Sequence, residues 1–168
     1  MKELTYICLV CSLFILLISC SFTPKDSPQS FIGKKLIVDK NWDSTFDSIF
    51  LQKELVLVSY VDSNECTPCA LERFQYIQAN SHKLEESNIA TILIFWGSPQ
   101  KDIMDFLTRY HNAYPIIWDI NKTFKTTNYV LNNPVFQDFI IDSTRKIRWI
   151  GYPFFDKETW ECCKKAIQ

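Results

Sequence analysis

Apolar runs of two kinds alternate along the chain and predict a layered α/β fold. Residues 54–62 (ELVLVSYVD) and 89–96 (IATILIFW) are nearly continuous in Val, Ile and Leu, which is typical of strands buried on both faces of a sheet. Shorter runs predict further strands at residues 35–38, 114–119, 135–142 and 146–150. The last two are expected to pair antiparallel across a turn at residues 142–145.

Between these runs the apolar side chains recur three or four positions apart, which predicts helices. They are expected at residues 68–81, 99–110 and 157–167, with a turn or short helix at 42–50 and a weakly helical stretch up to about residue 130. Ser98 is expected to cap the helix that opens with Pro99. The predicted order is therefore β-α-β-α-β-(α)-β-β-α. This order indicates an α/β domain whose central mixed sheet is flanked by helices.

The first twenty residues have the pattern of an export signal. Residues 6–18 (YICLVCSLFILLI) are almost wholly apolar, but this run is shorter than the roughly 20 residues that cross a membrane and fits a secretory signal. The ending LISC resembles a bacterial lipobox, whose cysteine, here Cys20, is lipidated. We therefore expect a lipoprotein signal peptide at 1–19, lipidated Cys20 and a flexible tether at 20–30, and one globular domain at 31–168. A permanent N-terminal anchor helix is the alternative.

Either reading places the domain at the membrane, outside the cytoplasm. We expect a periplasm-facing cell-envelope lipoprotein, and Ser21 after the lipobox favours the outer membrane. The net charge of −1 argues against a nucleic-acid partner, because no basic excess is present to neutralise phosphates. The 47% hydrophobic content excludes general disorder. The N-terminal signal predicts the membrane as a partner, through the lipid anchor.

The stretch Cys66-Thr67-Pro68-Cys69 carries the candidate chemistry. It follows a predicted buried strand and opens a predicted helix, which is where α/β sheets place their sites. A helix N-terminus stabilises a thiolate, the reactive form of cysteine. Cys66 is therefore the candidate nucleophile, and Cys69, one turn into the helix beneath it, would resolve the mixed disulfide. Pro68 is tolerated in a first helical turn.

Three segments resemble a known family: YVDSNECTPCALERF, YPIIWDINKTF and FQDFIIDSTRKIRWIGYP, within residues 54–153. They are similar to the thioredoxin-fold thiol–disulfide oxidoreductases of the membrane-tethered TlpA/ResA-like group, especially the lipoproteins of Bacteroidetes-type bacteria. The resemblance implies a thioredoxin-like fold, with Cys66 attacking and Cys69 resolving. It also implies no organic cofactor, exchange with protein thiols and disulfides of the envelope and with a redox partner, and reduction rather than oxidation.

The chain departs from this family in two places. Glu65 precedes Cys66, where many relatives carry an aromatic residue. The cis-proline that relatives place opposite the two cysteines falls, by ungapped counting, on Phe136. Pro134 could serve through a small insertion, with Asn133–Pro134 as the cis bond; otherwise the feature is absent. Asn133 and Pro134, together with Pro68, are therefore weak candidates for substrate binding.

Two other functions remain open from the sequence. The first is a non-catalytic binding module in which Cys66 and Cys69 form a structural disulfide. The second is a metal-handling lipoprotein, with Cys162-Cys163 as a further ligand pair; because there is no second CxxC and no paired histidine, we assign no metal ligands. Adjacent cysteines pair badly, so Cys162 and Cys163 are expected on a helix with one of them buried.

Two remaining expectations concern acidic groups near the cysteines. Asp62 and Glu65 are expected to be solvated loop carboxylates, with a proton relay to Cys69 as the alternative. Tyr60 stands where thioredoxins often keep a buried acid, so that proton acceptor is expected to be missing.

Overall fold

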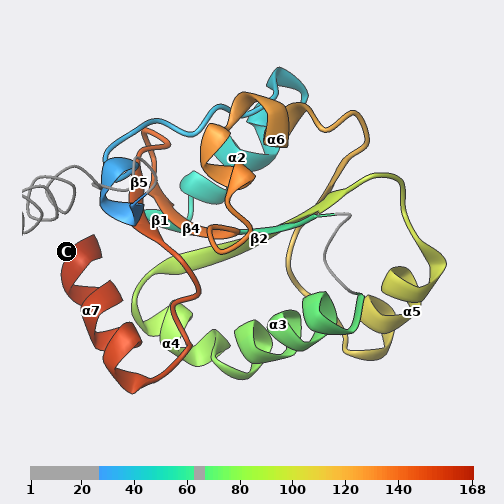
Figure 1. Ribbon diagram of the computed structural model, residues 1–168. Coiled ribbons are helices and arrows are strands. Elements are labelled where there is room, and N and C mark those ends of the chain that lie inside the picture. The colour runs from blue at the N-terminus through green and yellow to red at the C-terminus, as the bar shows by residue number, and fades with distance from the viewer. Residues whose placement is uncertain (1–26, 63–66) are drawn as a thin grey trace, which may run out of the picture.

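The computed structural model describes residues 27–62 and 67–168 and contains a five-stranded sheet in the order β3-β2-β1-β4-β5 (Figure 1). The strands are β1 (Leu55–Val61), β2 (Ile89–Trp96), β3 (Ile116–Asp119), β4 (Asp138–Asp142) and β5 (Ile147–Ile150). β1, β2 and β3 are parallel, whereas β4 runs antiparallel to β1, and β5 antiparallel to β4. The predicted mixed sheet is confirmed.

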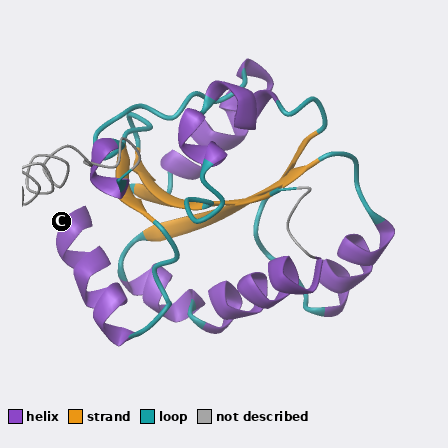
Figure 2. Cartoon of the chain, viewed as in Figure 1, coloured by secondary structure: helices purple, strands orange, loops and turns teal. Residues whose placement is uncertain are grey.

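Helices cover the sheet on both faces (Figure 2). One face carries α2 (Asp43–Phe50) and α6 (Thr123–Thr127), and the other carries α3 (Thr67–Ala79), α4 (Ser81–Glu86), α5 (Lys101–Arg109) and α7 (Lys157–Ile167). Three 3-10 turns, η1 (Pro28–Ser30), η2 (Lys40–Trp42) and η3 (Tyr129–Asn132), lie in the connections. The three-layer α/β arrangement expected from the alternating pattern is therefore present.

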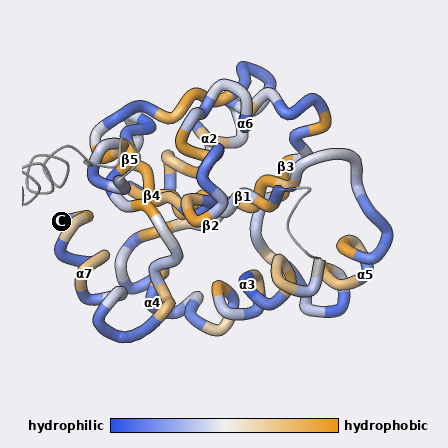
Figure 3. Tube along the Cα trace, viewed as in Figure 1, coloured by the Kyte–Doolittle hydropathy of each residue, from blue (hydrophilic) through white to orange (hydrophobic). Residues whose placement is uncertain are grey.

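The buried strands explain why apolar side chains pack on both faces of the sheet. Along β1, Val56, Val58 and Tyr60 pack toward α2 and α6, whereas Leu57 packs toward α3, α4 and α7. This alternation follows from the two-residue period of a strand. Figure 3 shows apolar residues concentrated along the strands, whereas polar and apolar residues alternate along the helices.

Several predicted boundaries are wrong. Residues 35–38 form only one bridge, between Lys35 and Lys146, instead of a strand. The helix expected from Pro99 begins at Lys101, because its N-cap is Gln100 in extended conformation and not Ser98. The helix expected to end near residue 81 is divided at Asn80 into α3 and α4.

The strand expected from residue 135 begins at Asp138, because the residues before it fold back on themselves. The N–H of Phe136 donates to the carbonyl of Asn133, and the N–H of Val135 donates to the Asn133 side chain. These two bonds close a turn that precedes β4.

The predicted signal peptide and Cys20 lie outside the described residues. Within the part of the chain that the structure does describe, no helix combines the length and apolar character that crossing a membrane requires.

Cys162 and Cys163 lie on α7, and both are free thiols. Cys162 is exposed, while Cys163 is buried against the core beneath the sheet. The expectation that one of the two is buried in a helix is confirmed.

Burial gives a testable contrast between these two thiols. It raises the pKa of Cys163 to about 12, so we expect iodoacetamide at pH 8 to label Cys162 in the folded protein and Cys163 only after unfolding. The unfolded chain releases the Cys163 proton near pH 9 and the folded chain only near pH 12, so this residue makes stability fall between those values, by at most about 1.4 kcal/mol per pH unit. Urea unfolding from pH 8 to 11 should show a weaker decline in Cys163→Ala than in the unaltered protein. Equal declines would contradict the assignment.

Candidate functional site

Cys69 lies in the first turn of α3, the helix that follows the central strand β1. Its side chain is exposed. Cys69 is disulfide-bonded, and the two other described cysteines are free, so its partner is neither of them. Cys66 lies outside the described residues. Pro68 is exposed in the same turn. Proline is tolerated there because the N–H groups of a first helical turn have no partner within the helix.

Arg73 stands one helical turn after Cys69 and connects α3 to two strands. Its guanidinium donates to the carbonyl of Tyr60 near the end of β1 at 2.8 Å and to the Gln137 side chain at 2.6 Å. It also lies 3.9 Å from the carboxylate of Asp138, the first residue of β4. The Arg73 side chain is only 14% exposed and that of Asp138 only 4%, so this is a largely desolvated ionic network.

The network fixes the first half of α3 against the sheet. The Tyr60 N–H donates to the Gln137 carbonyl at 2.8 Å, and the Tyr60 carbonyl accepts from Arg73. The backbone of Tyr60 therefore connects β1 both to α3 and to the residue before β4. Residue i+4 on a helix lies on the same side as residue i, which places a positive charge one turn behind Cys69. The sequence analysis missed Arg73. The signal that pointed to it was an arginine among the inward-facing positions Ala70, Phe74 and Ile77.

A second polar group lies under α6, on the opposite face of the sheet. Tyr60 is buried, as expected, and its hydroxyl donates to the carboxylate of Asp119 at 3.4 Å. Burial raises the pKa of Tyr60, and the charges of Asp119 and Asp62 raise it further, so the phenol stays neutral. Asp119 also accepts the N–H groups of Phe124 and Lys125 in α6. Position 60 therefore carries a phenol in place of the acid, and the buried carboxylate of Asp119 lies beside it.

Asp62 is buried and ion-paired with Lys125 of α6, so the interpretation as a solvated loop carboxylate is wrong. The side-chain exposure of Lys125 is 22% and that of Asp62 is 9%. The ion pair connects Asp62, the residue that follows β1, to α6. Glu65 lies outside the described residues.

Removing the cation of this pair should destabilise the fold. Because Lys125→Met leaves the Asp62 carboxylate in a poorly solvated place, we expect a loss of about 1–3 kcal/mol in the free energy of unfolding. Urea titration measures it. Lys164→Met, which breaks an exposed pair with Glu161, is the matched control and should leave the midpoint unchanged. Equal effects of the two substitutions would refute a stabilising role for Lys125.

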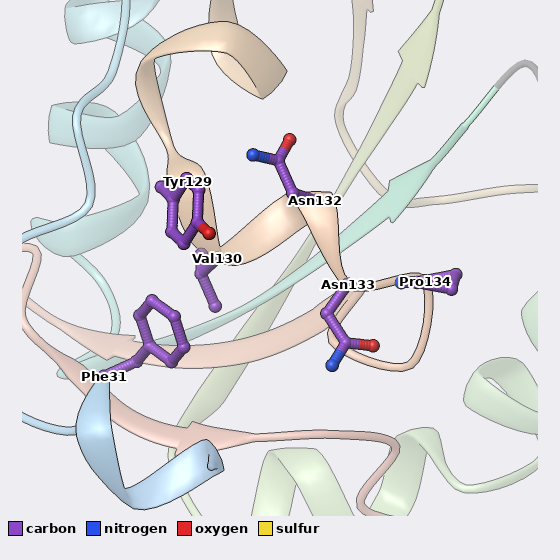
Figure 4. Close-up of a pocket in the computed structure, with 6 residues that line it drawn as sticks. All are labelled: Phe31, Tyr129, Val130, Asn132, Asn133 and Pro134. Atoms are coloured by element: carbon purple, nitrogen blue, oxygen red, sulfur yellow. The ribbon is translucent and has the colours of Figure 1, made fainter. Parts of the chain in front are cut away.

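Asn133 and Pro134 lie on the turn after η3 and line a pocket of about 400 Å³ (Figure 4). Its other lining residues are Phe31, Tyr129, Val130 and Asn132. No described peptide bond is cis, so Asn133–Pro134 is trans and the cis alternative is wrong. Phe136, the position given by ungapped counting, is buried and contacts Phe31. Of this segment, Gln137 contacts Arg73 through a side-chain hydrogen bond.

The described residues contain no group of three or more His, Cys, Asp or Glu side chains that could hold a metal ion. The disulfide at Cys69 and the ionic network of Arg73 and Asp138 are thus the chemically distinctive features of this end of the sheet. A disulfide that is exposed at a helix start is open to attack by an external thiolate.

This architecture is the thioredoxin-like fold: a central mixed sheet with helices on both faces and the CxxC cysteine at the start of the helix after the central strand. Solved structures confirm it. The thioredoxin domain of a thiol-disulfide oxidoreductase from Bacteroides vulgatus has a TM-score of 0.55 and 10% sequence identity, over 82% of this chain and 98% of that one.

Two further structures share the fold. A candidate thiol:disulfide interchange protein, DsbE, from Chlorobium tepidum has a TM-score of 0.50 and 19% identity, over 70% of this chain and 82% of that one. The peroxidoxin BcpB from Mycobacterium tuberculosis has a TM-score of 0.50 and 13% identity, over 71% and 82%. No protein-family model matches the chain, and no curated protein matches it. At these identities the comparisons establish the fold.

Proposed function

We propose that the chain is an envelope thiol–disulfide oxidoreductase that exchanges dithiol and disulfide with protein substrates through Cys66 and Cys69. The observation that carries the proposal is the exposed, disulfide-bonded Cys69 in the first turn of the helix after the central strand. The solved structures that share this fold include proteins named for the same chemistry, which supports the assignment by analogy.

In the proposed cycle the reduced protein donates two electrons. The Cys66 thiolate attacks a substrate disulfide, forms a mixed disulfide and releases one substrate thiolate. The Cys69 thiolate then attacks the Cys66 sulfur, which releases the second substrate thiolate and leaves the Cys66–Cys69 disulfide. The substrate gains two electrons and, once both thiolates are protonated, two protons. A dithiol redox partner in the envelope restores the reduced protein, and no organic cofactor is needed.

The surroundings of Cys69 favour thiolate chemistry. The helix N-terminus stabilises negative charge on sulfur. Cys66 is proposed as the attacking residue because it is the first cysteine of the motif. Pro68, Asn133 and Pro134 are proposed as weak substrate contacts.

The proposed location is the cell envelope. The LISC sequence and the apolar run before it support lipidation of Cys20 and exposure of the domain to the periplasm, with Ser21 favouring the outer membrane. By family analogy, the direction proposed is reduction.

The test is the reduction potential of the dithiol in the full chain, equilibrated in detergent with glutathione or dithiothreitol buffers and read by alkylation mass shift. A reversible two-electron transition between about −120 and −270 mV supports exchange, and the lower half of that range supports a reductase. A pair that stays oxidised below about −300 mV would instead identify a structural disulfide and overturn the proposal. The control is Cys162→Ser, which should leave the potential unchanged.

A further inference from the structure

Two lysines face each other at the β5 edge of the sheet. The segment before α2 runs antiparallel to the start of β5, where the Leu36 N–H donates to the carbonyl of Arg145 at 2.8 Å. The Ile147 N–H likewise donates to the carbonyl of Lys34 at 2.9 Å. These two bonds enclose the bridge between Lys35 and Lys146. Figure 1 shows the segment in blue beside β5.

The bridge places two like charges opposite each other. Its bonding pattern is that of a non-hydrogen-bonded antiparallel pair, in which the Cα atoms lie roughly 4.5 Å apart and the side chains share one face. Like charges at such positions destabilise the pairing of the two segments. Lys35 and Lys146 are both exposed, and so is Lys34 in the adjoining turn. The domain alone therefore gains no stability from having two lysines at this bridge.

The acidic side chains of this region already bind other cations. Arg145 is paired with Asp43 and Asp47 of α2. Arg148 is paired with Asp142. Among the described residues, no ion pair includes any of the three lysines. Three positive charges are thus left for an anionic partner.

Exposed isoleucines lie beside these lysines. Leu36 is buried in the core, so its neighbours Lys35 and Ile37 point away from the core, as alternate residues of an extended chain do. Ile37 is 55% exposed, and Ile32 in the preceding turn is 44% exposed. The Asn128 side chain binds both the N–H and the carbonyl of Ile37, at 2.8 and 2.7 Å. The backbone is therefore satisfied there, and side chains are what the surface offers to a partner.

We propose that this surface, the lysine patch (Lys34, Lys35 and Lys146 with Ile32 and Ile37), lies on the anionic phospholipid surface of the membrane that anchors the chain. The ammonium groups would bind lipid phosphates, and the isoleucines would enter the headgroup region. Anionic lipid would also relieve the repulsion at the bridge. The inference rests on the proposed N-terminal anchor. It fits the length of the tether, because the seven residues from Cys20 to Ser27 span at most about 25 Å.

This contact would also orient the candidate redox site. The Asp142 N–H donates to the Lys146 carbonyl, and Asp142 pairs with Leu55, the first residue of β1. Cys69, in contrast, lies in the helix that follows the other end of β1. A domain that lies on the lysine patch therefore directs Cys69 away from the lipid, toward proteins in the aqueous phase.

The experiment places the full chain, with its N-terminal segment, in lipid nanodiscs that contain a trace of lipid with a nitroxide headgroup. Paramagnetic broadening of isoleucine methyl resonances then reports proximity to the membrane surface. With about 30% phosphatidylglycerol, Ile32 and Ile37 should broaden at least about 5-fold more than Ile120. Ile120 is 62% exposed and follows β3, at the opposite edge of the sheet. Pure phosphatidylcholine, or about 1 M salt with its screening length of about 3 Å, should reduce the difference below about 2-fold.

A charge reversal separates the membrane contact from a role in folding. Lys35→Glu places opposite charges at the bridge, so the urea midpoint should not fall, yet the broadening of Ile37 should drop about 5-fold. Lys101→Glu makes the same change of net charge at the exposed start of α5 and should retain the broadening.

Three results would overturn the lysine patch as a membrane contact: equal broadening of the three isoleucines in anionic nanodiscs, the same pattern in neutral lipid, or an unchanged pattern in Lys35→Glu. The lysines would then serve only to keep sheet edges of different molecules apart. A chain that does not enter nanodiscs at all would overturn both the proposed anchor and this contact. None of these results depends on the reduction potential of the cysteines, so the membrane contact and the redox function can fail separately.

Discussion

Replacing Cys69 with serine is expected to convert the protein into a covalent trap for its substrate. Cys66 can still attack a disulfide, but the mixed disulfide then waits for an external thiol. An intramolecular thiol acts at an effective concentration of roughly 10⁵ M or more, against millimolar thiol in solution. Turnover should therefore fall by at least about 10³-fold. Fluorescence release from a labelled glutathione disulfide measures the rate, and mass spectrometry measures the trapped adduct.

The control for this trap is an exposed cysteine elsewhere on the same chain. Cys162→Ser removes the free thiol on α7 and should retain full turnover with no adduct. Cys66→Ser should be inactive and should also form no adduct. If Cys69→Ser kept more than a tenth of the activity, or if the adduct formed on Cys66→Ser instead, the assigned roles of the two cysteines would be wrong.

A helix or strand is predicted accurately where its local sequence pattern determines its structure, and less accurately where tertiary contacts do. β2 was predicted at its observed bounds because an uninterrupted run of branched apolar residues suits a strand that is buried on both faces. Residues 35–38 carry a similar local pattern, yet they lie at the sheet margin, where their strand-type pairing is limited, among the described residues, to one bridge between Lys35 and Lys146. Local pattern establishes that such a segment is extended, but only the neighbours decide whether a strand forms.

In the candidate site, too, features set by adjacent residues were predicted and contacts between distant residues were not. The spacing of Cys66 and Cys69 between a strand and a helix was readable, because it depends on adjacent residues alone. The contact of Arg73 with Gln137 joins residues 64 positions apart, and that of Tyr60 with Asp119 joins residues 59 apart. No periodicity in the sequence encodes either pair. The cis alternative at Asn133–Pro134 failed for a related reason: counting residues cannot detect the turn that shortens β4.

Arg73→Met is expected to have the largest effect on stability away from the cysteines. Methionine fills the apolar part of the space but leaves the Asp138 carboxylate, whose side chain is 4% exposed, without this cation, and the Tyr60 carbonyl without the Arg73 donor. Breaking a buried ionic network by removing one partner costs roughly 3–5 kcal/mol. We expect about 3 kcal/mol here, because the ion pair itself is long at 3.9 Å and the two hydrogen bonds carry most of the interaction. Urea unfolding at pH 7 gives the loss directly.

Two controls separate this network from a general effect of losing an arginine. Arg148→Met removes a half-exposed arginine that binds Asp142 and should cost less than about 1 kcal/mol. Arg73→Lys keeps the charge but not the two-pronged geometry, so its loss should be intermediate. In Arg73→Met combined with Asp138→Asn, part of the loss should be recovered, since the uncompensated charge is then gone. Additive losses in that pair would show that Arg73 and Asp138 are not coupled, and that Arg73 stabilises the fold through its hydrogen bonds to Tyr60 and Gln137 and through packing. In that case Asp138 would not be needed to hold the guanidinium of Arg73 in place.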